Sequence, residues 1–199
     1  MRVLLTLCLL ACLGYVLGHG PYCCAPDQWE GTIQMLEGYA TPGHPPGAET
    51  GTTETHFDFT NQREATFSNL NAGLVNTQFR VLKDYKKQTQ FTYHPDSGAC
   101  EKKDLPYPLV RTCPPYSAVK LDPVVFGGGS DKAIVDMYML ANPTFNETFG
   151  FTRDKCLPFT RALWGSVAGD PLMQIYSYIN LTIGIKDTSV FDVPSSCKS

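Results

Sequence analysis

The residues that could carry chemistry are few, and their spacing favours a structural protein or a binding protein over an enzyme. Four histidines, His19, His44, His56 and His94, stand apart in the chain, and none has the spacing of a zinc motif. The glycine-rich stretch FGGGSDK, residues 126–132, resembles a phosphate loop only superficially, because it lacks Gly-Lys followed by Ser or Thr. No nucleophile–base pair or metal triad can be assembled from recognisable spacing, so we rank an enzyme last.

The first 18 residues have the pattern of a secretory signal peptide. Arg2 precedes an apolar run from Val3 to Val16, and Gly18 suits a cleavage site. The run is shorter than the roughly 20 apolar residues of a membrane-spanning helix, and no later stretch is long and apolar enough to span a bilayer. We therefore predict a signal peptide over 1–18 and a single secreted domain over 19–199.

Cysteines and sequons agree with secretion. Two of the eight cysteines fall in the leader, and an even number beyond it is typical of disulfides in an extracellular chain. The remaining six are Cys23, Cys24, Cys100, Cys113, Cys156 and Cys197. The residues themselves leave the pairing open, except that a bond between the neighbours Cys23 and Cys24 would need a strained small ring. Sequons at Asn146 and Asn180 predict a glycoprotein.

Alternation of apolar and polar residues predicts a mostly β (α+β) chain, an antiparallel sheet with one or two short helices. The strand signals are HFDFTNQREATF with a turn near Asn61, the pair NTQFRVL and QTQFTYH around KDYKKQ, then AIVDMYMLA and QIYSYINLTIGIK. DTSVF after Lys186 suits one helical turn capped by Asp187. LPFTRALWG, residues 157–165, stays open between helix and strand. TPGHPPGAETGTT, residues 41–53, is typical of a long surface loop.

One apolar face per strand must be covered by a helix, another sheet or a ligand. A glycan on Asn180 has to point to solvent, which turns the isoleucine face of the last strand inward and its tyrosine face outward. The inward residues are our candidates for a lipid-binding wall. They are Phe57, Phe59, Phe79, Val81, Phe91, Tyr93, Val135, Met137, Met139, Ile175, Ile179 and Leu181. Each could equally be plain core.

Charge excludes one class of partner. The net charge is −3 with no basic patch or arm, which argues against nucleic acid as a partner. Acidic residues are not arranged as an EF-hand loop, so a calcium site would have to be assembled from separate loops.

An ordered set of short motifs resembles the ependymin-related proteins. It begins with CAPDQWEG at Cys24 and continues with Phe57-Asp58 before Asn61-Gln62-Arg63, CEKK at Cys100 and CLPF at Cys156. It closes with IGIKD at Ile183, Ser189-Val190-Phe191 and Pro194 before Cys197. No single element is decisive, but the ordered set spans essentially the whole mature chain.

The resemblance implies a fold, partners and a disulfide pattern. The fold is a strongly curved antiparallel sheet, a half-barrel similar to the bacterial lipoprotein-carrier (LolA-like) fold, around an apolar pocket. The family is secreted into extracellular fluid and matrix, forms homodimers and is linked to lipid binding, calcium and cell adhesion. Its pattern pairs Cys24 with Cys156 and Cys100 with Cys197. Cys23 and Cys113, outside that pattern, would pair with each other, or one of them would link two subunits.

Two functions from different classes therefore stand ahead of catalysis. The first is a secreted glycoprotein that binds a lipid or other hydrophobic ligand in an apolar pocket of the curved sheet. The alternative is a calcium-responsive protein of the extracellular matrix or of cell adhesion, acting through its surface without a ligand pocket. A cluster of carboxylates would favour the second, and the local sequence shows none.

Overall fold

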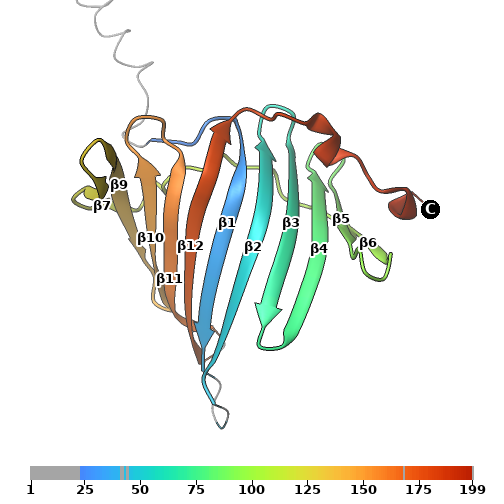
Figure 1. The fold of residues 1–199 in the computed structure, drawn as a ribbon, viewed down its shortest axis with the longest axis horizontal. Coiled ribbons are helices and arrows are strands. Elements are labelled where there is room, and N and C mark those ends of the chain that lie inside the picture. Colours follow the sequence, from blue (N-terminus) through green and yellow to red (C-terminus); the bar gives the residue numbers. More distant parts are fainter. Residues whose placement is uncertain (1–22, 41–42, 44, 168, 199) are drawn as a thin grey trace, which may run out of the picture.

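One open antiparallel sheet organises the chain. A computed structural model describes residues 23–40, 43, 45–167 and 169–198, and the predicted signal peptide lies outside them. The strands are ordered β6-β5-β4-β3-β2-β1-β12-β11-β10-β9-β7, and β8 also pairs with β9 (Figure 1). The end strands β6 and β7 are not paired with each other among the described residues, so the sheet stays open. The predicted β class is confirmed.

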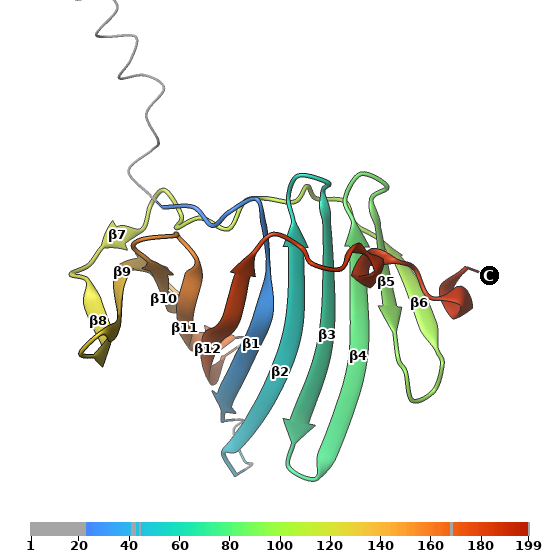
Figure 2. The same cartoon turned by 45° about the horizontal axis from the view of Figure 1, so that its top comes forward.

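The strands alternate with short turns for most of the chain. They are β1 (Gln28–Tyr39), β2 (Gly47–Asp58), β3 (Arg63–Ala72), β4 (Val75–Asp84), β5 (Thr89–Tyr93), β6 (Cys100–Asp104), β7 (Val119–Lys120), β8 (Val124–Gly128), β9 (Asp131–Ala141), β10 (Phe145–Thr152), β11 (Pro158–Val167) and β12 (Asp170–Ile183). Two short 3-10 helices follow, η1 (Thr188–Phe191) and η2 (Ser195–Cys197). Figure 2 shows that β10 to β12 are turned relative to β2 to β4, as expected of a twisted sheet.

Most local predictions are confirmed. The turns near Asn61 and over KDYKKQ join β2 to β3 and β4 to β5, and the glycine-rich stretch closes the β8–β9 hairpin. The Asp187 side chain accepts a hydrogen bond from the Ser189 N–H, which caps η1 as predicted. The ambiguous segment 157–165 belongs mostly to strand β11.

One prediction is wrong in part. Residues 47–53 of the predicted loop 41–53 are not loop but the first half of β2. This half pairs residue by residue with β1 on one side and β3 on the other. Tertiary pairing therefore overrides the loop-like Gly and Thr composition.

Two irregular segments cover opposite faces of the sheet at one end. We call residues 105–118, between β6 and β7, the strap, and residues 184–198, after β12, the tail. The strap passes behind the sheet in both views, whereas the tail, coloured red, runs in front of β3 and β4 (Figures 1 and 2). We name the two sides of the sheet the strap face and the tail face accordingly.

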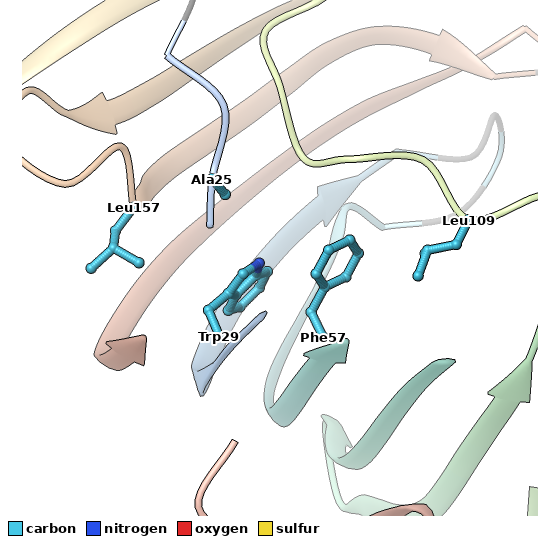
Figure 3. Close-up of a cluster of buried hydrophobic side chains, with 5 residues drawn as sticks. All are labelled: Ala25, Trp29, Phe57, Leu109 and Leu157. Atoms are coloured by element: carbon cyan, nitrogen blue, oxygen red, sulfur yellow. The ribbon is translucent and has the colours of Figure 1, made fainter. Parts of the chain in front are cut away.

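The main core lies under the strap. Trp29 of β1, Phe57 of β2, Leu109 of the strap, Ala25 and Leu157 form one buried cluster (Figure 3). A second cluster joins Ala118, at the end of the strap, to Tyr138 and Phe151 of β9 and β10. The strap therefore substitutes for the helix or second sheet that would otherwise cover this face.

Three disulfides hold the irregular segments, and two of the predicted pairings are wrong. Cys100 pairs with Cys197 as predicted, but Cys24 pairs with Cys113 and Cys23 with Cys156. Successive side chains of an extended chain point to opposite sides, so neighbouring cysteines reach two different segments. Cys24 thus ties the N-terminal segment to the strap, and Cys23 ties it to the β10–β11 turn.

Candidate functional site

A cavity of about 310 Å³ lies on the strap face at the centre of the sheet. Its walls come from β1, β2, β3, β11, β12 and the strap. The lining residues are Trp29, Ile33, Met35, Thr53, Thr55, Phe57, Glu64, Thr66, Thr112, Arg161, Tyr176 and Tyr178. Half of these residues are aromatic or aliphatic and half are polar or charged, so the cavity offers both apolar surface and hydrogen-bonding groups to a small molecule.

Three aromatic rings build the end of the cavity nearest the core. Trp29 and Phe57 stack at 5.6 Å between ring centroids, and Tyr178 meets Trp29 edge-on at 6.3 Å. Figure 3 shows the Trp29 and Phe57 rings side by side below the strap. Pairing in the sheet accounts for this contact, because Trp29 lies directly opposite Phe57.

A buried carboxylate fixes the strand ends that carry these rings. Asp58 is fully buried and accepts hydrogen bonds from Gln28, from Asn61 and from Arg63 at 2.8–3.0 Å. Burial alone raises the pKa of Asp58, but these donors outweigh it and hold the pKa below its usual value. The ionised side chain therefore closes the β2–β3 turn and also ties it to β1.

Two buried donors on wall residues have no partner within the described part of the chain. Trp29 is 3% exposed and Thr55 is 4% exposed. Among the described residues, neither Trp29 Nε1 nor Thr55 Oγ1 makes a hydrogen bond to the protein. Buried polar groups are nearly always paired in folded proteins, so these two donors lower stability, and protein atoms cover both of them.

The charged lining residues, in contrast, are neutralised. Glu64 accepts from Lys83 Nζ at 3.1 Å and from the Tyr85 hydroxyl at 3.0 Å. The Arg161 guanidinium donates to the buried Glu147 carboxylate. Each of these two charges is thus balanced by a neighbouring side chain.

A disulfide and a hydrogen bond hold the strap in place over one end of the cavity. The Cys24–Cys113 disulfide and a hydrogen bond of 2.8 Å from the Ala25 N–H to the Thr112 carbonyl join the N-terminal segment to the strap. Cys23–Cys156 joins the same segment to the β10–β11 turn. The disulfides of these two neighbouring cysteines thus fix the strap and the β10–β11 turn next to the core cluster.

The twelve predicted wall residues do not share one face. Strand register and packing place Phe57, Phe59, Phe79, Val81 and Leu181 on the strap side and the other seven on the tail face. Those seven are Phe91, Tyr93, Val135, Met137, Met139, Ile175 and Ile179. Of the twelve, Phe57 alone lines the strap-face cavity, within the part of the chain described. A lipid-binding role for the set stays a prediction.

A bulge in β12 explains why the residues of this strand do not face the sides that were predicted. Pairing of β1 with β12 shifts between Glu30 and Thr32, where Asn180 has a φ of 54°. The extra residue breaks the alternation, so Leu181 joins Tyr178 at the core cluster while Asn180 is exposed. The prediction that the tyrosine face of β12 points outward is therefore wrong, because Tyr176 and Tyr178 line the cavity.

The tail face carries a buried polar cluster. His56 Nδ1 lies 3.2 Å from Glu30, and its Nε2 lies 3.2 Å from Glu54. Glu30 also accepts from the Lys186 backbone N–H of the tail at 3.2 Å. Burial raises the pKa of Glu30, but this N–H and the His56 ring outweigh it, so the pKa lies below its usual value.

Several predictions lie outside what the structure tests. Asn180 is exposed and Asn146 half-buried, and glycosylation of either stays a prediction. Within the described residues no group of three or more His, Cys, Asp or Glu could hold a metal ion, and calcium binding also stays a prediction. No helix in that part of the chain is long and apolar enough to cross a membrane.

Sequence reasoning missed most of the cavity wall. Trp29 belongs to the motif at Cys24, yet the motif assigns it no role. Thr53, Thr55 and Thr66 are polar, so an apolar pattern omits them. The single available signal was the run of threonines in residues 52–55, which is typical of a strand.

Fold and site together define a disulfide-stapled, all-β protein with a cavity on one face of an open sheet. The chain belongs to the Ependymin family, whose model matches residues 75–197, more than half of the chain. It is similar to the Development-specific protein LVN1.2 of Lytechinus variegatus, at 29% identity over 133 residues, which cover 60% of this chain and 70% of that one. Membership and the three disulfides are consistent with secretion.

Solved structures give weaker likenesses. A LolA superfamily protein from Nitrosomonas europaea matches at a TM-score of 0.36 and 8% identity, covering 84% of this chain and 90% of that one. A DUF1329 family protein from Desulfovibrio piger has the same identity and coverage at a TM-score of 0.38. At these scores the matches carry no argument about function.

Proposed function

We propose that the protein is an extracellular binding protein for a small hydrophobic molecule, which it holds in the strap-face cavity. The observation that carries the proposal is the strap-face cavity of about 310 Å³, in which six aromatic or aliphatic side chains lie beside six polar ones. A ligand that is mostly apolar and has one polar end fits both features.

The driving force is burial of apolar surface. Contact with Trp29, Ile33, Met35 and Phe57 removes ligand area from water, at about 25 cal/mol per Å². Threonines of the lining supply hydroxyl groups that orient the polar end of the ligand.

The disulfides favour binding because they fix the strap before the ligand arrives. The strap is irregular and would lose much entropy if it were ordered only when the ligand arrives. Cys24–Cys113 fixes it beforehand, which lowers that cost.

Native mass spectrometry tests the proposal directly. The protein is secreted from a eukaryotic host and weighed before and after mild organic extraction. We expect a discrete extractable adduct of a few hundred daltons per chain. If the secreted protein carries no adduct and also fails to take up a panel of labelled lipids, the proposal is wrong.

A pair of variants assigns the adduct to a face. Ile33 is half-buried in the cavity wall, and the next residue, Gln34, is exposed on the opposite face. Ile33→Trp fills the cavity and should remove the adduct, whereas Gln34→Trp should retain it. The reverse pattern would place the ligand on the tail face.

A further inference from the structure

An apolar row on the tail face lies beside one of the two predicted glycosylation sites. We propose that the first sugar of an N-glycan on Asn146 packs against the Trp164 ring, so that the chain carries its own cover for this open part of the sheet. The site lies on the face opposite the strap-face cavity, and the proposal does not depend on the proposed function.

Strand register places the members of this row next to one another. Asn146 of β10 lies directly opposite Trp164 of β11, and Trp164 lies directly opposite Met173 of β12. Trp164 is three residues from Arg161, which lines the strap-face cavity, so the Trp164 ring is on the tail face. Directly opposite side chains of an antiparallel pair have Cβ atoms about 4.5–5.5 Å apart. The Asn146 amide therefore stands beside the indole ring on the same face.

The row is open to solvent although its larger side chains are apolar. Trp164 is 36% exposed and Met173 is 49% exposed. Small residues lie at both ends, because Asn146 also pairs with Ala141 and Met173 also pairs with Gly38. A Cβ atom added to Gly38 would meet no heavy atom within 4 Å beyond its chain neighbours, in the part of the chain described. The tail runs in front of β3 and β4, away from β10 and β11 (Figure 1).

The sequon supplies an occupant of matching chemistry. Asn146-Glu147-Thr148 lies within β10, with Asn146 and Thr148 on the tail face. A glycan on Asn146 must extend into solvent from that face, which keeps another protein from packing flat against it. The C–H groups of a sugar ring form an apolar side that packs on an aromatic ring, and this contact removes apolar area from water. The hydroxyl groups of the sugar stay in water, so the covered row presents a polar surface.

The second sequon provides a matched control in the same chain. Asn180 is exposed at the bulge of β12, where its φ is 54°. Pairing with β1 is interrupted there, so no residue of the described chain lies directly opposite Asn180. A glycan on Asn180 therefore extends into solvent without a cross-strand aromatic neighbour.

Acrylamide quenching of tryptophan fluorescence tests the contact on protein secreted from a eukaryotic host. Glycopeptide mass spectrometry first establishes which sequons are occupied. The chain has two tryptophans, and Trp29 is 3% exposed, so Trp164 is the one that acrylamide reaches. Asn146→Gln and Thr148→Ala each remove the first sequon, and Asn180→Gln removes the second. Two enzymes act on the folded parent protein, one that removes the whole glycan and one that leaves a single sugar.

We expect the quenching constant to rise about twofold in Asn146→Gln and in Thr148→Ala, because one side of the indole ring is uncovered. Removal of the whole glycan from the folded protein should give the same rise, so the test does not depend on secretion of the variants. Asn180→Gln and the protein trimmed to single sugars should match the parent.

Three results would overturn the proposal. The first is an unoccupied Asn146, and the second is a quenching constant that does not change when its glycan is lost. The third is an equal rise in Asn180→Gln, which would reflect a general effect of glycan loss on the fold. Adding Trp164→Phe to Asn146→Gln should abolish the rise, and a rise that persists would also contradict the contact. Ligand uptake on the strap face is unaffected by any of these outcomes.

Discussion

The two faces of β1 and β2 bury polar groups in different ways. On the tail face, Glu30 and His56 are buried, and each has hydrogen-bond partners that include the other. On the strap face, one residue away along each strand, Trp29 and Thr55 are buried as deeply, and among the described residues their donors have no partner. The same two strands therefore carry a completed network on one side and an incomplete one on the other.

The difference separates what holds the sheet from what is open to a ligand. A satisfied network rigidifies the structure around it, and here it anchors the tail through Lys186. An unsatisfied donor lowers stability. We expect changes on the tail face to alter stability alone and changes on the strap face to alter both stability and binding.

The largest effects come from the two disulfides that staple the strap and the tail. Cys24–Cys113 spans 89 residues and Cys100–Cys197 spans 97, so the chain-entropy model gives each roughly 4–5 kcal/mol. Paired Cys→Ser replacement of either bridge should cost a similar amount in denaturant unfolding. Only the strap pair should also abolish ligand uptake, measured where both variants are still folded. Equal loss of uptake in both would break the distinction between the faces.

The next effect concerns the turn that fixes the aromatic rings. Asp58→Ala leaves Arg63 without its buried partner and frees the Gln28 and Asn61 donors, which should cost about 3–5 kcal/mol. Asp84→Ala is the matched control in the next turn, where Asp84 pairs with the exposed Lys87, and should cost about 1 kcal/mol or less. Thermal unfolding of both variants measures the difference. Similar losses would show that the buried network around Asp58 does not position β1 and β2.

Much of the fold was predictable because it depends on local alternation. Residues 133–141 and 174–186 show period two, and the polar turn 83–88 lies between two such runs, so their strands were found. The first half of β2 was missed because its Gly and Thr residues are held by two neighbouring strands and not by their own preference. The strap could not be predicted, since a proline-rich segment without periodicity gives no sign of which face it crosses.

The cavity was harder to predict than the fold for two physical reasons. The bulge at Asn180 reverses the faces of β12, and a single exposed asparagine in a strand gives no warning of a positive φ. The cavity also combines side chains from five strands and the strap, and these become neighbours only when the sheet is in place. The disulfide error has the same origin, because two neighbouring cysteines do not reveal which one reaches which side.

A smaller effect tests the tail face through pH. Since the folded-state pKa of Glu30 is depressed, its contribution is complete above the unfolded value of about 4.3 and is lost as the pH falls through the folded value. Glu30→Gln should cost about 1–2 kcal/mol at pH 7, and the difference from the parent protein should shrink as the pH falls through the folded-state pKa. Glu54→Gln, at the more exposed partner of His56, should cost less. Urea unfolding across this pH range measures the stability of both variants. A stability difference that does not change with pH would contradict the stabilising role of the ionised Glu30 carboxylate.

The smallest effect distinguishes two threonines of the same strand, both of which line the cavity. The Thr53 hydroxyl lies 3.0 Å from Ser68 Oγ, whereas Thr55 Oγ1 is buried without a partner in the described chain. Thr55→Val removes an unpaired polar group and should stabilise the empty protein by about 1 kcal/mol, a rise in Tm of about 2–4 °C. Thr53→Val breaks a hydrogen bond and should destabilise it by about 1 kcal/mol. Opposite signs in calorimetry of the ligand-free protein would show that the Thr55 hydroxyl is kept at a cost to stability, whereas equal signs would show that it makes a hydrogen bond in solution.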